Sequence, residues 1–277
     1  MTNAAEWSGP VGNAWAQEWH RTDRMFSGLA PHLDAAILAA APPAGGKALD
    51  IGCGAGSTSL ALASARPDLM VTGIDVSPEL VAVAQSRAQA SPNCTFLTAD
   101  LDHDTPIADP NSVDLFVSRH GVMFFADPGA TFVRLRAAAR PGAALVFSCF
   151  RAAAANPWAS TLVADVTGAA PAATTTGYAP GPFGFADPAI PAAFLAAAGW
   201  QPAEPEPIDF TYIAGDGADP LAEAVALLRR IGPIASAIRT AADPHAMVDR
   251  LATMLERYRT GDLIAFPAAA WLWRATA

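Results

Sequence analysis

The sequence has little cysteine and almost no lysine. Its three cysteines are Cys53, Cys94 and Cys149, an odd number without the spacing of metal ligands, and Lys47 is its only lysine. Isolated thiols of this kind are typical of proteins from a reducing compartment. We therefore expect a cytoplasmic protein and no metal site.

Positive charge is also scarce. The chain has 17 Lys and Arg against 26 Asp and Glu, a net charge of −9, and its arginines are scattered. Binding to a polyanion depends on clustered cations that contact phosphates. This balance argues against nucleic acid as a substrate or partner.

Long apolar runs are missing, although 52% of the residues are hydrophobic. Pro42 and Pro43 interrupt the most apolar early segment, and no run approaches the roughly 20 residues that cross a bilayer. The first ten residues, MTNAAEWSGP, have neither the basic nor the apolar region of a secretory signal. We expect no membrane span, and the length suits a sizeable hydrophobic core. The sequence carries no signal for an oligomeric state.

The segment 48–56, ALDIGCGAG, organises the chain. Its apolar start is typical of a buried parallel strand, and a helical pattern follows it at 57–65. Between them stand three glycines, Gly52, Gly54 and Gly56. Glycine suits such a turn because it accepts positive φ and lets the backbone approach a ligand closely. Open α/β sheets bind nucleotide-like ligands at this position.

The glycine spacing separates two kinds of ligand. A dinucleotide fingerprint, G-x-G-x-x-G, requires its third glycine where this chain has Ser57. The pattern present is D-x-G-x-G-x-G, with Asp50 on the strand before the loop. It resembles motif I of class I S-adenosylmethionine (SAM) dependent methyltransferases. Asp75 closes the next predicted strand, at the distance where nucleotide folds place a carboxylate for the ribose hydroxyls, a feature that NAD enzymes share.

Further segments extend the resemblance over about residues 45–200. Together with the glycine loop, VTGID, TADL, ARPGAALVF and GPFGFADP resemble the ubiquinone/menaquinone-biosynthesis-like branch of small-molecule methyltransferases. The resemblance implies SAM as cofactor, with the glycines beside the methionine moiety, Asp75 at the ribose, Asp100 with Leu101 at the adenine, and Ser118 and His120 near the methyl group. The implied cofactor-contacting residues are Asp50, Gly52, Gly54, Gly56, Asp75, Val76, Asp100, Leu101 and Ser118.

His120 is a candidate catalytic base, because it alone near the expected methyl position titrates close to neutral pH. Members of this branch often have an aromatic residue there, so the histidine equally well fills an aromatic slot. Arg119 has two interpretations as well: it holds a substrate carboxylate, or it forms a surface ion pair. The other histidines show no metal-ligand spacing.

Alternating strand and helix patterns predict a doubly wound, Rossmann-like, mostly parallel sheet of seven strands, with helical N-terminal and inserted lid elements. The expected strands are at 47–51, 69–74, 94–97, 113–117, 144–150, 208–213 and 268–275, and the expected helices are at about 13–27, 31–40, 57–65, 78–90, 128–139, 157–166, 188–198, 220–231 and 244–259. The expected parts are a helical cap (1–44), a SAM-binding core (45–150), an active-site loop or lid (151–187) and a C-terminal part of the core (188–277) with a helical insertion at about 219–260.

The substrate pocket is expected to be apolar and aromatic. Its candidate lining residues are Trp15, Trp19, Arg119, Phe124, Trp158, Phe183 and Phe185. These residues favour an apolar or aromatic small molecule as the acceptor of a methyl group on O, N or C. Two alternatives remain: an NAD-dependent oxidoreductase, with which Ser57 conflicts, and a non-catalytic SAM-binding module.

Overall fold

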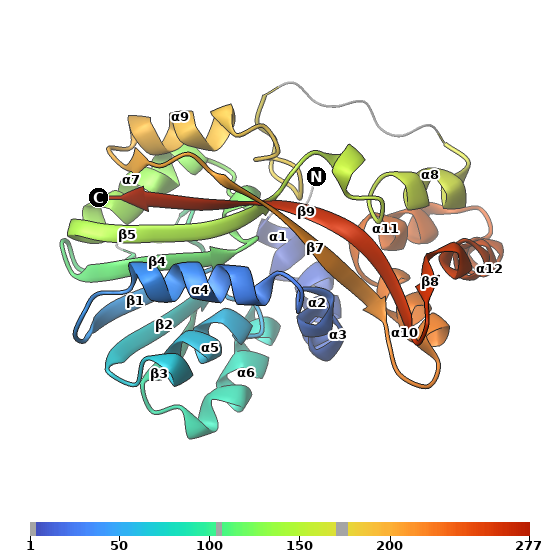
Figure 1. Cartoon of the computed structure of the whole chain (residues 1–277), viewed down its shortest axis with the longest axis horizontal. Helices are drawn as coiled ribbons and strands as arrows, with labels where there is room; N and C mark the ends of the chain where they lie inside the picture. The colour runs from blue at the N-terminus through green and yellow to red at the C-terminus, as the bar shows by residue number, and fades with distance from the viewer. Residues whose placement is uncertain (1–3, 104–106, 170–176) are drawn as a thin grey trace.

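The computed structural model describes residues 4–103, 107–169 and 177–277 (Figure 1). Part of the segment predicted as an active-site loop, residues 170–176, lies outside the described residues.

A central sheet runs through the molecule. Its strands are β1 (Gly46–Ile51), β2 (Leu69–Asp75), β3 (Cys94–Thr98), β4 (Val113–Arg119), β5 (Ala139–Phe150), β6 (Gln201–Pro202), β7 (Glu206–Gly215), β8 (Arg259–Thr260) and β9 (Leu263–Thr276). The order is β3-β2-β1-β4-β5-β9, with β6, β7 and β8 pairing with β9. The first five strands are parallel, whereas β9 is antiparallel to β5 and to β7.

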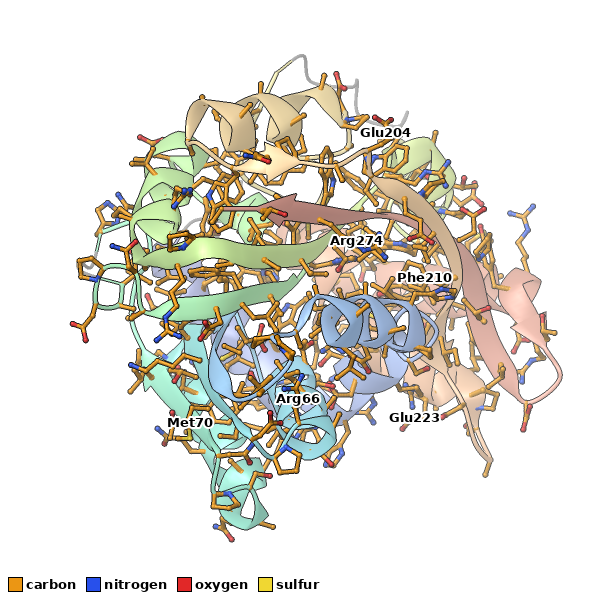
Figure 2. All side chains as sticks on the ribbon, turned by 60° about the vertical axis from the view of Figure 1, so that its left-hand side comes forward. Arg66, Met70, Glu204, Phe210, Glu223 and Arg274 are labelled. Carbon is orange, nitrogen blue, oxygen red and sulfur yellow. The ribbon has the colours of Figure 1, made fainter. Side chains whose placement is uncertain are left out.

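Helices cover both faces of the sheet. On one side lie α4 (Ala30–Ala40), α5 (Ser57–Ala65) and α6 (Pro78–Arg87), and on the other lie α7 (Pro128–Ala138) and α9 (Ala189–Ala197) (Figure 1). Met70 of β2, 53% exposed, points outward near the β3 edge (Figure 2). The layered, mostly parallel fold predicted from the sequence is confirmed.

Two further helical groups lie at the end of the sheet that forms the site. The first consists of α1 (Ala4–Trp7), α2 (Pro10–Gln17) and α3 (Trp19–Met25); the second consists of α8 (Thr161–Thr167), α10 (Pro220–Leu228), α11 (Gly232–Thr240) and α12 (Pro244–Leu255). Figure 1 shows the second group on the right-hand side, around the end of β7 and the start of β9. Glu223 of α10 (Figure 2) joins the two groups, because its carboxylate pairs with Arg21 at 2.8 Å and Arg24 at 3.0 Å on α3.

Helix starts follow the local sequence closely. Ser77, Asp127, Asp219 and Asp243 each stand just before a proline, and each side chain accepts a hydrogen bond from a backbone N–H in the first turn. These side chains satisfy N–H groups that have no partner within the helix, and proline suits the first turn because its missing N–H is not needed there. This explains why the predicted starts of these helices were accurate.

Three predictions of the fold need correction. The described chain has nine strands rather than seven, because the short β6 and β8 each pair with the ends of β9. The single helix predicted at 13–27 breaks at Glu18, whose φ and ψ of −103° and 17° lie outside the helical region. Helix α11 lies between two predicted helices and was not itself predicted; Pro233 stands in its first turn, a position that proline suits.

Candidate functional site

A cavity of about 970 Å³ opens where the carboxyl ends of β1, β2 and β4 meet α1, α2 and the turn between α10 and α11. The chain leaves β1 toward β2 on one side, while β4 lies on the other, so this is the switch point where open α/β sheets bind ligands. The cavity is at the upper end of the range of about 300–1,000 Å³ for small-molecule sites. It therefore has room for a large ligand, or for two ligands side by side.

The glycine loop forms the floor of the cavity. Gly52, Gly54 and Gly56 all have positive φ, at 63°, 55° and 83°. A Cβ on Gly56 would lie 2.7 Å from the Phe96 ring, whereas a Cβ on Gly54 would meet no atom within 4 Å. Gly54 thus faces open space inside the cavity, where only a residue without a side chain lets a ligand reach the backbone.

Asp50 is a buried carboxylate at the start of this loop. Its Oδ2 accepts a hydrogen bond of 2.6 Å from the Ser59 hydroxyl, whereas its Oδ1 is buried without a partner. Burial raises the pKa of Asp50 to about 7, because the charged form has lost its water. An orphaned carboxylate oxygen in a ligand cavity is suited to a cationic or hydrogen-bond-donating group.

Asp75, at the end of β2, connects the loop to the next helix. Its Oδ2 accepts from the Gly54 N–H at 2.8 Å and its Oδ1 from the Ser77 N–H at 2.9 Å. Burial raises the pKa of Asp75, and the two backbone hydrogen bonds oppose that rise. Each oxygen retains a second lone pair, so the carboxylate can also accept from ligand hydroxyls.

The other predicted cofactor residues mostly border the same cavity. Val76, Asp100 and Leu101 line it. The Asp100 carboxylate accepts from the Asp102 N–H and contacts His103 Nδ1, both at 2.9 Å. Ser118 does not line the cavity: its fully buried hydroxyl donates to the Ile51 carbonyl at 2.6 Å, which joins β4 to β1 beneath the floor.

His120 lies where β4 ends, and its imidazole is buried beside the cavity. Its φ is 63°, a left-handed conformation that only it and Asn111 share among the non-glycine residues described. Nδ1 lies 2.7 Å from the Ser148 hydroxyl, whereas Nε2 is buried without a partner. Burial, assisted by the positive charge of Arg119, lowers the pKa of His120 to about 3. The side chain is therefore neutral near pH 7.

Arg119 also lines the cavity, but its charge already has a partner. Its guanidinium lies 3.3 Å from Asp23 and over the Phe26 ring. Asp23 in turn pairs with Arg87 at 2.7 Å. Of the two interpretations of Arg119, the structure supports the ion pair, formed here on the cavity wall rather than on the outer surface.

The predicted aromatic lining is only partly present. Trp15, Phe124, Trp158 and Phe183 border the cavity, whereas Trp19 and Phe185 do not. Trp19 stacks on His20 and lies 4.0 Å beneath the Arg87 guanidinium. Phe185 has no exposed surface and stacks on Phe132 in the core. The last two assignments to the substrate pocket are therefore corrected.

Several lining residues were not predicted. They fall into an aromatic group and a basic group: Trp7, Phe26, Phe150, Tyr212, Arg229, Arg230 and Arg239. Phe26 and Phe150 hold the His120 ring edge-on, with ring centroids 5.1 and 4.1 Å away. The arginines come from the α10–α11 turn and α11, inside the helical insertion at about 219–260 that the sequence predicted as a lid over the site, but these individual residues were not predicted.

The described residues hold no group of three His, Cys, Asp or Glu side chains that could bind a metal ion. None of the helices described has the length and hydropathy that crossing a membrane requires. The thiol of Cys53 borders the cavity, where burial raises its pKa well above the usual value. It therefore behaves as a small packing group rather than a reactive thiolate.

Comparison with known proteins identifies the part of the chain that forms this floor. Residues 49–147 match a protein family described as a methyltransferase domain. The match spans the glycine loop, Asp75, Asp100 and His120, and it confirms the resemblance found from the motifs.

Two curated relatives are similar to part of the chain. One is a malonyl-acyl-carrier-protein O-methyltransferase from Paenibacillus sp. (strain JDR-2), 33% identical over 106 residues, which are 38% of each chain. The other is a trans-aconitate 2-methyltransferase from Klebsiella pneumoniae (strain 342), 38% identical over 87 residues, which are 31% of this chain and 32% of that one. The matched segments thus span about a third of the length of each relative.

Solved structures extend the likeness beyond the methyltransferase domain. The cyclase SpnF superposes with a TM-score of 0.58 at 18% identity, covering 100% of this chain and 97% of that one. Phosphoethanolamine N-methyltransferase 2 of Haemonchus contortus, solved with SAM, gives 0.55 at 16% identity and covers 100% of this chain and 60% of that one. At such identities these comparisons establish a shared fold.

Proposed function

We propose that the protein is a SAM-dependent methyltransferase that acts on a small molecule. One observation carries the proposal: the open backbone at Gly54 lies between two buried carboxylates, one of which has an oxygen without a partner. A glycine cradle bordered by carboxylates suits a ligand with a cationic group and vicinal hydroxyls, whereas a pyrophosphate would be repelled.

The residues present fit SAM. Asp50 Oδ1 would accept from the ammonium of the methionine part, Asp75 from the ribose hydroxyls, and Asp100 with Leu101 would border the adenine. When bound, SAM supplies a methyl group on a positively charged sulfur, which is a good leaving group. The remaining contribution of the protein is to orient the acceptor and exclude water, and orientation alone can lower a barrier by about 7–11 kcal/mol.

The rest of the cavity supports an acceptor with an apolar or aromatic body. Phe150, Trp158, Phe183 and Tyr212 form a continuous wall, and Trp158 stacks on Tyr212 at 5.2 Å between ring centroids. We assign this wall, the N-terminal cap and the α10–α11 region to acceptor binding. The buried free thiols also favour a cytoplasmic enzyme.

Because one neighbour of the same fold is named a cyclase, the fold alone does not define the reaction. Calorimetric titration with SAM, with its demethylated product and with NAD tests the cofactor. We expect both sulfur compounds to bind and NAD not to bind. Binding of NAD without SAM would refute the proposal, and binding of SAM without methyl transfer to any acceptor would favour a non-catalytic module.

A matched pair of variants tests whether SAM occupies the cradle. Gly54→Ala and Gly142→Ala introduce a methyl group at positive φ, 55° and 80°, where no atom lies within 4 Å. Both carry a similar backbone strain of roughly 1–2 kcal/mol, but only Gly54 lines the cavity. We expect at least tenfold weaker SAM binding for Gly54→Ala alone; equal affinities would place the cofactor elsewhere.

A further inference from the structure

The side chains of His120 and Ser148 form an isolated polar pair in an apolar part of the site. The His120 ring lies between Phe26 and Phe150, and Ser148 on β5 has no exposed surface. The backbone N–H of His120 also donates to the backbone carbonyl of Ser148 at 3.1 Å, which fixes the two residues relative to each other. Within the described residues, His120 Nδ1 is the partner of the Ser148 hydroxyl and Nε2 has none.

This arrangement distinguishes between the two neutral forms of the imidazole. If Nδ1 carried the proton and donated to Ser148, the serine O–H would be a buried donor without an acceptor. If Ser148 donates to Nδ1, the serine is satisfied and the proton lies on Nε2, which has no partner among the described residues. The first form leaves two buried polar groups without a partner, the serine O–H and the lone pair of Nε2, whereas the second leaves only the Nε2–H. Because each such group costs about 1–3 kcal/mol, the second form is favoured. The polar atom left for a ligand is then an N–H donor.

We propose that Ser148 holds His120 as its Nε2–H tautomer, and that this N–H donates to an oxygen of a carboxylate that accepts the methyl group. The proposal rests on the proposed function and names its substrate class. It replaces the role of His120 as a general base, since the nitrogen without a protein partner already bears a proton.

A carboxylate acceptor agrees with the rest of the site. The oxygen–methyl bond forms as the sulfur–methyl bond breaks, the electron pair stays on sulfur, and no proton is released because the carboxylate is already ionised. A neutral histidine with a low pKa suits such a reaction, which needs a hydrogen bond and no base. Arg229 and Arg239 also line the cavity, and in the part of the chain described neither has a carboxylate partner, so they favour an anionic substrate.

Nuclear magnetic resonance of protein labelled with ¹⁵N-histidine tests the tautomer without requiring activity. The His120 signals are assigned by their loss in His120→Phe, and we expect the Nε2–H pattern, unchanged from pH 5 to pH 8. Ser148→Ala should shift the Nδ1 resonance, while Ser148→Thr, which keeps the hydroxyl, should preserve it. An Nδ1–H pattern, or titration of His120 near pH 6.5, would overturn the proposal even if SAM binds as proposed.

Substrate class is tested by transfer of a tritiated methyl group from SAM to a panel of mono- and dicarboxylic acids and matched phenols and amines. Methyl esters release labelled methanol in alkali, whereas methyl ethers and amines do not. We expect alkali-labile label on at least one acid. The carboxylate assignment would be overturned if all the label were stable in alkali or if no acid were labelled. Titration of the same sample with SAM shows whether the cofactor site itself is intact.

Once an acid that the enzyme methylates is known, two variants distinguish a hydrogen-bond donor from a general base at His120. His120→Gln keeps an N–H donor but cannot act as a base, and His120→Phe keeps the ring shape without a donor. Loss of a hydrogen bond to a charged group predicts kcat/KM about 10- to 100-fold lower for His120→Phe than for His120→Gln. Equal losses of kcat/KM in the two variants, together with a flattened pH profile of kcat/KM in both, would indicate that His120 acts as a base instead.

Discussion

Replacing Asp50 with asparagine should make the ligand-free protein more stable and its SAM binding weaker. The substitution keeps the shape of the side chain and an oxygen for the Ser59 hydroxyl, while it removes a buried negative charge. Among the described residues, no cation lies at hydrogen-bond distance from that charge, and its Oδ1 has no partner. The charge is therefore unfavourable in the empty site, and we infer that it is retained because a ligand uses it.

The magnitude follows from the pKa of Asp50, which burial raises from 3.8 to about 7. A pKa raised on folding means that the folded state keeps a proton that the unfolded chain releases. Stability is then full below pH 3.8 and decreases as the pH rises toward 7, above which the loss is complete. A shift of about three units corresponds to ~4 kcal/mol, of which ~3 kcal/mol falls between pH 5 and pH 8.

Urea unfolding of both proteins at pH 5 and pH 8 measures this effect. The advantage of Asp50→Asn over the parent protein should grow by ~3 kcal/mol between the two pH values, and calorimetry at pH 8 should show SAM binding weakened at least tenfold. Asp209→Asn, at a carboxylate that is 85% exposed, is the matched control, with a change within about 0.5 kcal/mol. A pH-independent difference, or undiminished SAM affinity, would refute the reasoning.

Three other substitutions probe the site and its support. Asp75→Ala should weaken SAM binding more than tenfold by calorimetry, because it removes the acceptor of the Gly54 N–H; unchanged affinity would mean that this carboxylate does not contact the cofactor. Gly56→Ala places a Cβ 2.7 Å from the Phe96 ring at a φ of 83°, so urea unfolding should show a loss of at least ~2 kcal/mol. Glu223→Gln should lower the melting temperature by about 2–4 °C at pH 7. Because its arginine partners lower the pKa of Glu223 from 4.5 to about 2, this difference should shrink as the pH falls through that window, and a constant difference would exclude the ion pairs as its cause.

The cofactor end of the site was predictable because its residues are close in sequence to the elements that position them. Asp50, Gly54 and Asp75 each stand where a predicted strand ends, and parallel strands bring their carboxyl ends to one edge of a sheet. Positive φ at each loop glycine follows from the same local geometry. Short-range rules therefore located these groups without knowledge of the packing.

The acceptor end was less predictable because side-chain direction there depends on small backbone changes. Trp15 and Trp19 would share a face of a continuous helix, but the break at Glu18 turns Trp19 away to stack on His20. Phe185, two residues after Phe183, leaves the cavity for the core. Neither change has a marker in the local sequence.

The sequence by itself determined the layered α/β fold, the cradle at Gly54 and the carboxylates around it, since these depend on strand ends and glycine conformations a few residues apart. Only the tertiary structure decided which nitrogen of His120 contacts Ser148 and which arginines border the cavity. Ser148 and the α10–α11 region come from distant parts of the chain. A hydrogen bond or a cavity wall formed by residues far apart in the sequence depends on tertiary packing, which leaves no recognisable pattern in the sequence around each residue.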